Sequence, residues 1–226
     1  MQAVILAGGK GTRLQSVVSD VPKPMAPVNE RPFLEYIMQH LVKAGMRQVI
    51  MSVGYKYQCI VDYFQDEYRG MAVEYSIEEK PLGTGGAIKA ALKKCTGDRV
   101  FVLNGDTFFD VDYHSMYRFS EETDAPLVMA VKEMQDFDRY GCVEVAEEKI
   151  VGFREKKFCK NGFVNGGVYC ISRNLLDDVE SNVFSFEKDF LEKCCGELRV
   201  PVFPSQGYFI DIGVPEEYLK AIEHFR

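Results

Sequence analysis

Short apolar runs alternate with segments of helical periodicity along the first half of the chain. Four runs have the length and composition of buried strands: 3–7, 48–53, 72–77 and 99–103. Three segments between them repeat apolar residues at helical spacing: 33–44, 58–65 and 86–95. Strands that alternate with helices in this way predict a parallel sheet with helices on both faces.

The alternation of strands and helices ends beyond residue 125. Four strand-like stretches then lie close together: 127–132, 142–146, 149–154 and 164–171. Two later stretches have helical spacing, 185–195 and 215–225. We therefore expect an α/β fold whose mixed, mainly parallel sheet is extended by the second half, together with a smaller cap. No linker separates the halves, so the chain is expected to form a single domain over 1–226.

Composition narrows the classes of function. The formal net charge is −7, which argues against a nucleic-acid partner, because such proteins carry a basic face. No apolar run approaches the ~20 residues of a membrane span, so we expect no membrane partner. Seven scattered cysteines without a CxxC pair fit reduced thiols, and only two residues precede the first strand, so we expect a cytoplasmic protein without a signal peptide.

A glycine-rich turn follows the first apolar run, in the stretch VILAGGKGTRL at 4–14. Ligands of an open parallel sheet bind at the carboxyl ends of its strands, and this turn lies there. Gly8, Gly9 and Gly11 would let backbone N–H groups approach phosphate oxygens, and Arg13 adds a positive charge. The spacing matches neither a P-loop nor G-x-G-x-x-G, and a plain tight turn is the alternative.

A second cation stands on stiffened backbone. Lys23 lies between two prolines in PKP at 22–24, and each proline restrains its own φ and the residue before it. An ammonium held in this way could meet a phosphate at little cost in backbone entropy. An exposed surface turn is the alternative.

A second glycine-rich turn, KPLGTGGA at 80–87, follows the third strand and opens a helix. Its backbone could line a nucleobase. Just upstream, Glu78 and Glu79 could accept the adjacent N1–H and N2–H donors of guanine. For these two acids, a helix N-terminus with solvated carboxylates explains the pattern equally well.

Two aspartates are candidate metal ligands. Asp106 in LNGDT directly follows the fourth strand, and Asp211 stands between apolar neighbours in YFIDIG. A carboxylate at a strand end can hold Mg²⁺ while phosphates and waters complete the shell. A buried structural acid is the alternative, and the sequence does not show whether the two residues meet.

Three polar stretches of the second half are suited to a sugar phosphate. In REKK at 154–157, Lys156 could contact a phosphate and Glu155 could accept bonds from hydroxyls. Turns at 140–141 and 165–167 offer Gly141 and Asn165 to a polyol. A mixed-charge run of this kind is also typical of a solvated face.

Together these stretches resemble the sugar nucleotidyltransferase (nucleoside-diphosphate-sugar pyrophosphorylase) family. The matching motifs occur in the family's order and span nearly the whole chain: LAGGKGTRL at 6–14, PKP at 22–24, PLGTGGA at 81–87, NGD at 104–106, EK at 155–156, NGG at 165–167 and IDIG at 210–213. The resemblance implies a Rossmann-like, GT-A-like nucleotidyltransferase fold, without the C-terminal left-handed β-helix of longer members.

The resemblance also implies a reaction, in which a sugar 1-phosphate attacks the α-phosphate of a nucleoside triphosphate to give NDP-sugar and pyrophosphate. Such a transfer needs positioning and charge neutralisation more than a protein nucleophile. The implied catalytic residues are Arg13, at the departing pyrophosphate, and Lys23, near the α-phosphate. Asp106 and Asp211 would bind the Mg²⁺ cofactor.

The implied binding residues fall into two groups. The nucleotide would be held by Leu6, Gly8, Gly9, Gly11, Thr12, Glu78, Pro81, Gly83, Thr84, Asn104 and Gly105. The sugar 1-phosphate would be held by Gly141, Glu155, Lys156 and Asn165.

Within the family, three stretches are most similar to the bacterial heptose 1-phosphate guanylyltransferases: 16–36, 52–57 and 104–110. This likeness implies GTP as the nucleotide and a role in supplying GDP-heptose for surface polysaccharide. The alternatives are a mannose 1-phosphate guanylyltransferase, an enzyme that uses dTTP or UTP, and a non-catalytic regulatory paralogue. The presence of Arg13, Lys23, Asp106 and Asp211 together argues against the paralogue. The sequence leaves the oligomeric state open, including a homo-oligomer.

Overall fold

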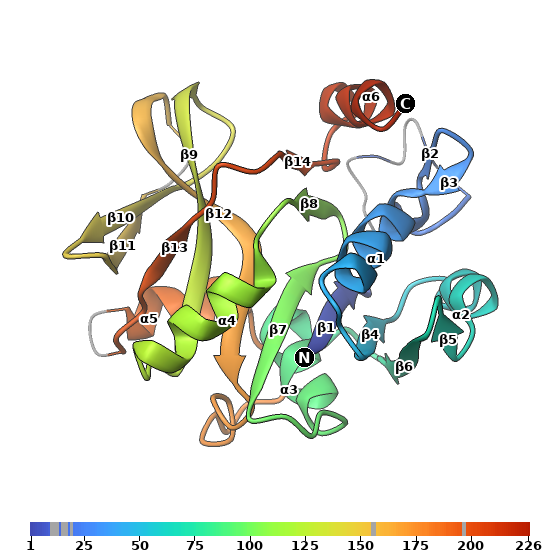
Figure 1. Ribbon diagram of the computed structural model, residues 1–226, viewed down its shortest axis with the longest axis horizontal. Coiled ribbons are helices and arrows are strands. Elements are labelled where there is room, and N and C mark those ends of the chain that lie inside the picture. Colours follow the sequence, from blue (N-terminus) through green and yellow to red (C-terminus); the bar gives the residue numbers. More distant parts are fainter. Residues whose placement is uncertain (10–13, 15–17, 19, 155–156, 196–197) are drawn as a thin grey trace.

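A twisted mixed sheet, ten-stranded among the described residues, runs through the molecule (Figure 1). The computed structural model describes residues 1–9, 14, 18, 20–154, 157–195 and 198–226. The central strands are parallel and follow the spatial order β7 (Arg99–Asn104), β1 (Gln2–Ala7), β4 (Gln48–Val53) and β6 (Met71–Ile77). These are the four strands that the apolar runs of the first half predict.

The second half extends the same sheet with mainly antiparallel pairings. The long strand β12 (Cys159–Ser172) lies beside β7 and also pairs with β9 (Leu127–Phe137). Further out are β10 (Cys142–Ala146), β11 (Lys149–Arg154) and β13 (Val202–Pro204). At the opposite edge, β6 pairs with the short β5 (Glu67–Tyr68). The α/β class and the extension of the sheet are thus confirmed.

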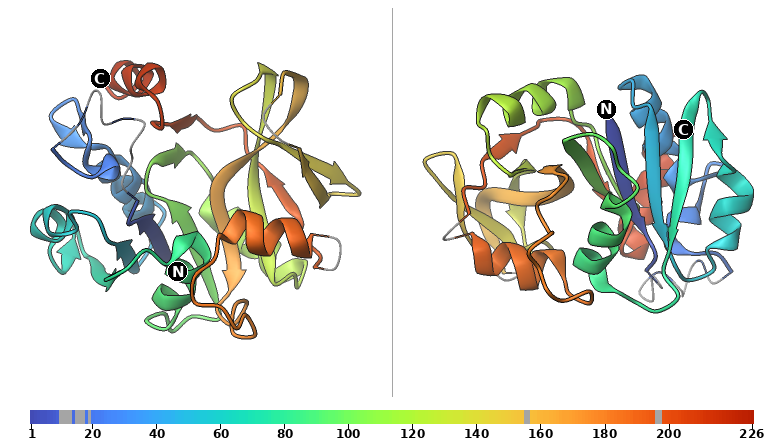
Figure 2. Two further views of the ribbon diagram at one scale, coloured as in Figure 1. Left: turned by 180° about the vertical axis from the view of Figure 1, so that it is seen from behind. Right: turned by 90° about the horizontal axis from the view of Figure 1, so that it is seen from below.

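Helices cover both faces of the sheet, as the two views in Figure 2 show. The core on one face takes in residues of α1 (Phe33–Lys43), α2 (Gln58–Phe64), α4 (Tyr113–Glu122) and, from beyond β14, α6 (Pro215–His224). The other carries α3 (Gly83–Leu92), the π-helical η3 (Phe186–Leu191) and α5 (Glu192–Cys194). Strand β1 shows the alternation directly, since Ala3 and Ile5 belong to the first core and Val4 to the second.

Helix α1 shows how apolar spacing determines packing. Phe33, Leu34, Ile37, Met38 and Leu41 recur at positions that share one side of a helix, and each is at most 2% exposed. Burial of such side chains stabilises the fold by roughly 1.5–3 kcal/mol each. The helix ends before Gly45, whose φ of +69° favours glycine.

Other elements differ from the sequence expectation. Helix α3 begins at Gly83 rather than at 86, so the second glycine-rich turn is helical from Gly83 onward. The expected helix at 185–195 is a π-helix followed by one short α-helical turn. Helix α4 was not expected, because its many polar residues mask the apolar periodicity. Asp112 caps it, with Oδ1 accepting from the backbone N–H of Ser115 at 3.0 Å.

The end of the chain returns to the middle of the molecule. Strand β14 (Phe209–Asp211) pairs antiparallel with β8 (Thr107–Phe109), directly after the central strand β7. Helix α6 then packs near the small hairpin of β2 (Pro27–Val28) and β3 (Arg31–Pro32), where the Tyr218 hydroxyl donates to the Pro27 carbonyl. The chain just before this hairpin is the 3₁₀ turn η2 (Lys23–Met25), so the last helix supports the segment that carries Lys23. Among the described residues, no helix has the length and apolar character to cross a membrane.

Candidate active site

A cleft of about 700 Å³ opens where the parallel strands end. Its walls come from the segments that follow β1, β4, β6 and β7, which is where an open parallel sheet binds ligands. The volume is in the range of small-molecule sites. The predicted residues that line the cleft are Leu6, Gly8, Gly9, Lys23, Glu78, Pro81, Gly83, Thr84, Asn104, Asp106 and Asp211.

Not every predicted site residue is found at the cleft among the residues that the structure describes. Gly105, Gly141 and Asn165 are not among the described residues that line the cleft. The backbone N–H of Gly105 donates to the carbonyl of Leu6 at 2.9 Å, so Gly105 holds the end of β7 against β1. Gly11, Thr12, Arg13, Glu155 and Lys156 lie outside the described residues, and their predicted roles stay predictions.

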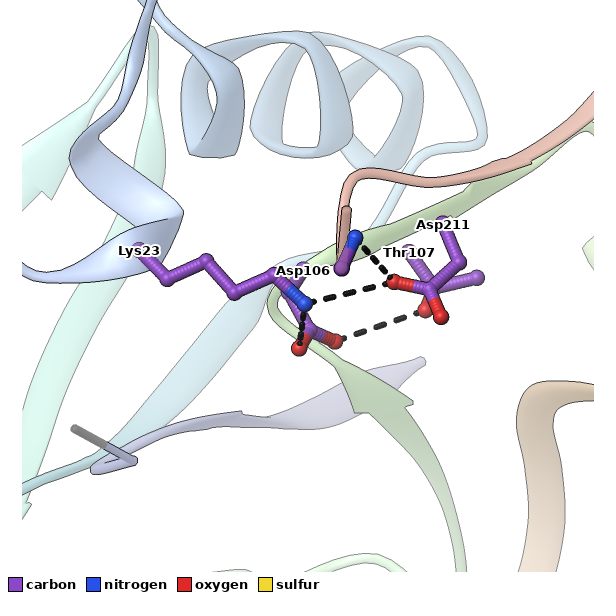
Figure 3. Close-up of polar contacts among 5 residues, drawn as sticks. Lys23, Asp106, Thr107 and Asp211 are labelled. Atoms are coloured by element: carbon purple, nitrogen blue, oxygen red, sulfur yellow. Dashed lines mark hydrogen bonds and ion pairs between the residues drawn. The ribbon is translucent and has the colours of Figure 1, made fainter. Parts of the chain in front are cut away.

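Lys23, Asp106 and Asp211 meet on one side of the cleft (Figure 3). The Lys23 ammonium donates to Asp106 Oδ2 at 2.6 Å and to Asp211 Oδ1 at 3.3 Å. Pairing of Asp211 with Thr107 in the β14–β8 ladder brings Asp211 beside Asp106. The structure therefore answers what the sequence left open, because the two aspartates do meet.

Neighbouring donors hold the two carboxylates in place. Asp211 Oδ1 also accepts the backbone N–H of Gly213 at 2.8 Å, and the Thr107 hydroxyl lies 3.4 Å from Asp106 Oδ1. Burial raises the pKa of Asp211, and the nearby Asp106 carboxylate raises it further, while the Lys23 ammonium opposes both. Two acids this close need a cation, and Lys23 supplies one from a side chain that is 11% exposed.

The donor set fits a magnesium ion. Among the described residues, no three His, Cys, Asp or Glu side chains gather as a closed cage for a metal. Mg²⁺ is usually held by one or two carboxylates and completes its shell with substrate phosphates and water. Asp106 and Asp211 would provide those carboxylates on the wall of the cleft.

Glu78 lines the same cleft from the segment that follows β6. Its Oε1 accepts from the Ser52 hydroxyl at 3.2 Å, and its Oε2 accepts the backbone N–H of Leu82 at 3.0 Å. A Cβ on Gly8 would lie 2.6 Å from Glu78 Oε1, so a larger residue there would push this carboxylate away from its partners Ser52 and Leu82. Glu79 also lines the cleft, which keeps both predicted acids at this wall.

The glycines of the second motif make room for a distant segment. Cβ atoms at Gly83, Gly85 and Gly86 would lie 2.1–2.5 Å from atoms of Phe184 or Asn182. This close approach seats the segment before η3 on the start of α3. The motif therefore has a packing role that the sequence did not reveal, in addition to the exposure of Gly83 to the cleft.

The cleft contains one acidic residue that the sequence did not predict as part of the site. Glu187 of η3 lines the cleft, and its Oε2 accepts from the Thr84 hydroxyl at 2.9 Å. The Thr84 hydroxyl in turn accepts the backbone N–H of Phe186 at 2.8 Å. In the sequence, Glu187 stands in a mixed polar and apolar stretch that is typical of any surface helix, so no local signal marks it.

The chain is similar to known proteins over nearly its whole length. The model of the family described as nucleotidyl transferase matches residues 2–226. The chain belongs to the nucleotidyl transferase family. Within this family, it is 48% identical over 220 residues to the D-glycero-alpha-D-manno-heptose 1-phosphate guanylyltransferase of Campylobacter jejuni, covering 96% of this chain and 97% of that protein.

Two further relatives support the assignment. The enzyme of the same name from Aneurinibacillus thermoaerophilus is 46% identical over 229 residues, and the match covers 100% of each chain. The crystal structure of HddC from Yersinia pseudotuberculosis, complexed with GMP-PN, superposes with a TM-score of 0.91 at 39% identity. That match covers 100% of this chain and 99% of the other, so the nucleotidyltransferase fold extends over the full length.

Proposed function

We propose that the protein joins D-glycero-α-D-manno-heptose 1-phosphate to GTP and releases pyrophosphate. The observation that carries this proposal is the meeting of Lys23, Asp106 and Asp211 on the wall of a cleft large enough for a nucleotide. The choice of substrates rests on the 46–48% identity with two heptose 1-phosphate guanylyltransferases whose lengths the chain matches almost completely.

In the proposed reaction, an oxygen of the sugar phosphate forms a bond to the α-phosphorus of GTP. The bond from that phosphorus to the bridging oxygen of the β-phosphate breaks, and pyrophosphate leaves with the electron pair. No protein nucleophile is needed, because positioning and charge neutralisation lower the barrier to phosphoryl-type transfer. Lys23 would bring its ammonium to the triphosphate from a backbone restrained by Pro22 and Pro24.

Asp106 and Asp211 would hold Mg²⁺, which when bound neutralises charge on the phosphates. The carboxylates are held on the cleft wall by Thr107 and Gly213, so they need little rearrangement to accept the ion. Lys23 would then exchange its contacts with the two acids for contacts with phosphate oxygens. Glu78 and Glu79 would face the guanine, whose N1–H and N2–H donors match a carboxylate.

The setting of the reaction is part of the same proposal. We place the protein in the cytoplasm, where GTP and sugar phosphates are available, with small-molecule substrates as its partners. A homo-oligomer is compatible with the exposed side chains of Phe158 and Val151, which are 70% and 54% exposed.

The test is pyrophosphate release with Mg²⁺, crossing GTP, ATP, CTP, UTP and dTTP with heptose, mannose and glucose 1-phosphates. We expect efficient release only for GTP with heptose 1-phosphate. Efficient release with another pair would keep the reaction class and overturn the proposed substrates. Absence of release for every pair, from protein that unfolds cooperatively, would favour the non-catalytic paralogue.

A further inference from the structure

We infer that the buried hydroxyl of Tyr169 is a positioning group for Glu187 on the cleft wall, which it joins to Asn165. This inference rests on the proposed function, because it takes Glu187 as an acceptor for hydroxyls of the sugar 1-phosphate. Tyr169 itself is 0% exposed and touches no solvent. Its role is therefore exerted through the side chains that its hydroxyl contacts.

A bulge in β12 makes the contact with Asn165 possible. Asn165 pairs with Val131 of β9 and Tyr169 with Met129, so four positions on β12 correspond to two on β9. Along a regular strand, residues four apart lie about 13 Å from each other. Here the Asn165 amide nitrogen Nδ2 donates to the Tyr169 hydroxyl at 2.6 Å. The bulge thus folds the strand back so that the two side chains meet.

Gly167 allows this bulge and ties it to the nucleotide side. Its φ of +66° lies in the left-handed region that favours glycine. A Cβ at Gly167 would lie 2.7 Å from Nδ2 of Asn104, a residue that lines the cleft. The bulge is therefore packed against the cleft wall, and the NGG motif at 165–167 acquires a structural explanation.

The hydrogen bonds also fix the orientation of Asn165. Its Oδ1 accepts the backbone N–H of Gly167 at 2.9 Å, while Nδ2 donates to Tyr169. Since the two ends of the amide have different partners, the side chain has one defined orientation. Asn165 is not among the described residues that line the cleft, so its amide acts here as a fixed donor to the Tyr169 hydroxyl.

On its other side, Tyr169 reaches the acid of the cleft. Because the Tyr169 hydroxyl accepts from Asn165, its own hydrogen is available for Glu187 Oε1, which lies 3.5 Å away. The second oxygen of Glu187 accepts from Thr84 at 2.9 Å. A chain of hydrogen bonds thus runs from Asn165 on β12 through Tyr169 to Glu187 on η3. It fixes the Glu187 carboxylate, which lines the cleft. Carboxylates held in this way are common acceptors for sugar hydroxyls.

The geometry distinguishes positioning from simple packing. The Tyr169 ring packs edge-on against Phe186, with centroids 5.2 Å apart, and phenylalanine would keep this contact. Only the hydroxyl would be lost. Without it, Asn165 loses the acceptor that fixes its amide, and Glu187 loses a donor, although neither residue is itself changed.

The experiment measures KM for each substrate separately in Tyr169→Phe. We expect KM for the sugar 1-phosphate to rise about tenfold, since a hydrogen bond to a charged or tightly oriented group is lost. KM for the nucleotide should change less than twofold. The matched control is Tyr113→Phe, which removes another buried hydroxyl, from α4 in the core on the opposite face. We expect it to leave both KM values unchanged.

A double-mutant cycle provides a readout that a merely structural role would not move. Asn165→Ala and Tyr169→Phe should be strongly non-additive in KM for the sugar 1-phosphate, because either change breaks the same link. The cycle between Asn165→Ala and Glu187→Gln should also be non-additive, since Tyr169 joins them. This second cycle keeps the test decisive if Tyr169→Phe fails to fold.

The assays use whichever substrate pair the unmodified protein turns over, so the two proposals fail separately. If that pair is not GTP with heptose 1-phosphate, the proposed substrates are wrong while the inference on Tyr169 is still measured. If no pair is turned over, calorimetric binding of heptose 1-phosphate gives the same comparison. Equal rises in both KM values, additive cycles, or unchanged sugar binding in Tyr169→Phe would overturn the positioning role.

Discussion

Replacement of one atom in the Asp106 side chain should lower turnover without affecting the stability of the fold. Asp106→Asn keeps the shape of the side chain but replaces a charged oxygen with an amide, a poorer ligand for Mg²⁺. The Lys23 ammonium also loses its 2.6 Å partner, so the remaining pair with Asp211 carries the whole contact. We expect turnover to fall at least a hundredfold at saturating substrates, with little change in thermal unfolding.

The control for this change is Asp124→Asn, because Asp124 is fully exposed and its carboxylate is 3.7 Å from Arg99. That variant should keep normal kcat. Titration of Mg²⁺ separates the effects, since a weakened metal site requires more Mg²⁺ for half-maximal rate. Normal turnover of Asp106→Asn at ordinary Mg²⁺ concentrations would remove Asp106 from the metal site.

Glu35 shows how a buried carboxylate can serve stability alone. Its side chain is 8% exposed, and it accepts from the hydroxyls of Tyr63 at 2.6 Å and Tyr68 at 2.9 Å, and from Gln39 at 3.1 Å. Burial raises the pKa of Glu35, but the hydrogen bonds from Tyr63, Tyr68 and Gln39 and the charge of Arg31 together outweigh it, so the pKa lies below its ordinary value of 4.5. The folded protein therefore favours the ionised form.

The lowered pKa of Glu35 determines how the stability of the protein depends on pH. The stabilisation by Glu35 is fully present above about pH 4.5 and is lost as the pH falls through the lower pKa of the folded state. We expect Glu35→Gln to lower the free energy of unfolding at pH 7 by about 1–3 kcal/mol. It should also flatten the decline of stability below pH 4.5. Urea unfolding at pH 7 and pH 4 measures both, with the exposed Glu121→Gln as control. An unchanged pH dependence would contradict this account.

At the scale of elements, substitution of Gly86 near the start of α3 should have two opposing effects on stability. In a helix interior, Gly→Ala ordinarily stabilises by up to about 1 kcal/mol. At Gly86, however, a Cβ would lie 2.2 Å from the Asn182 carbonyl oxygen, and backbone cannot move aside as a side chain can. We expect Gly86→Ala to destabilise by a net 1–3 kcal/mol, the usual range for overpacking, and to displace η3 with Glu187. Urea unfolding and KM for the sugar 1-phosphate measure the two consequences.

The matched control is Gly152→Ala on β11. Its Cβ would lie 2.9 Å from Glu144 Oε2, the far end of a flexible side chain that can turn away. That variant should change stability by less than about 0.5 kcal/mol, as is usual for surface substitutions. If Gly86→Ala were the more stable of the two, the glycines of the second motif would have no packing role.

The sequence predicts elements well where apolar residues are unbroken and less well where contacts outside the element decide. The strands of the first half and helix α1 follow directly from their apolar residues. Helix α4 depends on a cap at Asp112 and on a few buried residues among polar ones. The bulge of β12 depends on packing against Asn104, which no local pattern encodes. In such elements tertiary contacts override local periodicity.

For the whole molecule, the site is predictable only where strand ends determine it. The residues after β1, β6 and β7 were expected at one edge of the sheet, and there they lie. The arrival of Asp211 beside Asp106 needs the β14–β8 pairing, and the arrival of Glu187 needs the glycines of α3. Contacts between residues more than 100 positions apart, such as Lys23 with Asp211, leave no signal in local spacing.

Because the cleft draws on residues from Leu6 to Gly213, ligand binding and global folding must be coupled. A ligand that binds only the folded state stabilises it by about 2.7 kcal/mol at a hundred times its Kd. For a chain of this size, each kcal/mol raises Tm by roughly 2–4 °C. We therefore expect GTP with Mg²⁺, without sugar phosphate so that no turnover occurs, to raise Tm by about 5–10 °C at that excess. Calorimetric scans with and without Mg²⁺ measure this, with UTP as the comparison nucleotide.

The variant Lys23→Met should abolish most of this shift in Tm, because it lacks the ammonium that would contact the phosphates. If UTP stabilises as strongly as GTP at equal concentration, the cleft does not select guanine, and the assignment of Glu78 and Glu79 to the base is wrong.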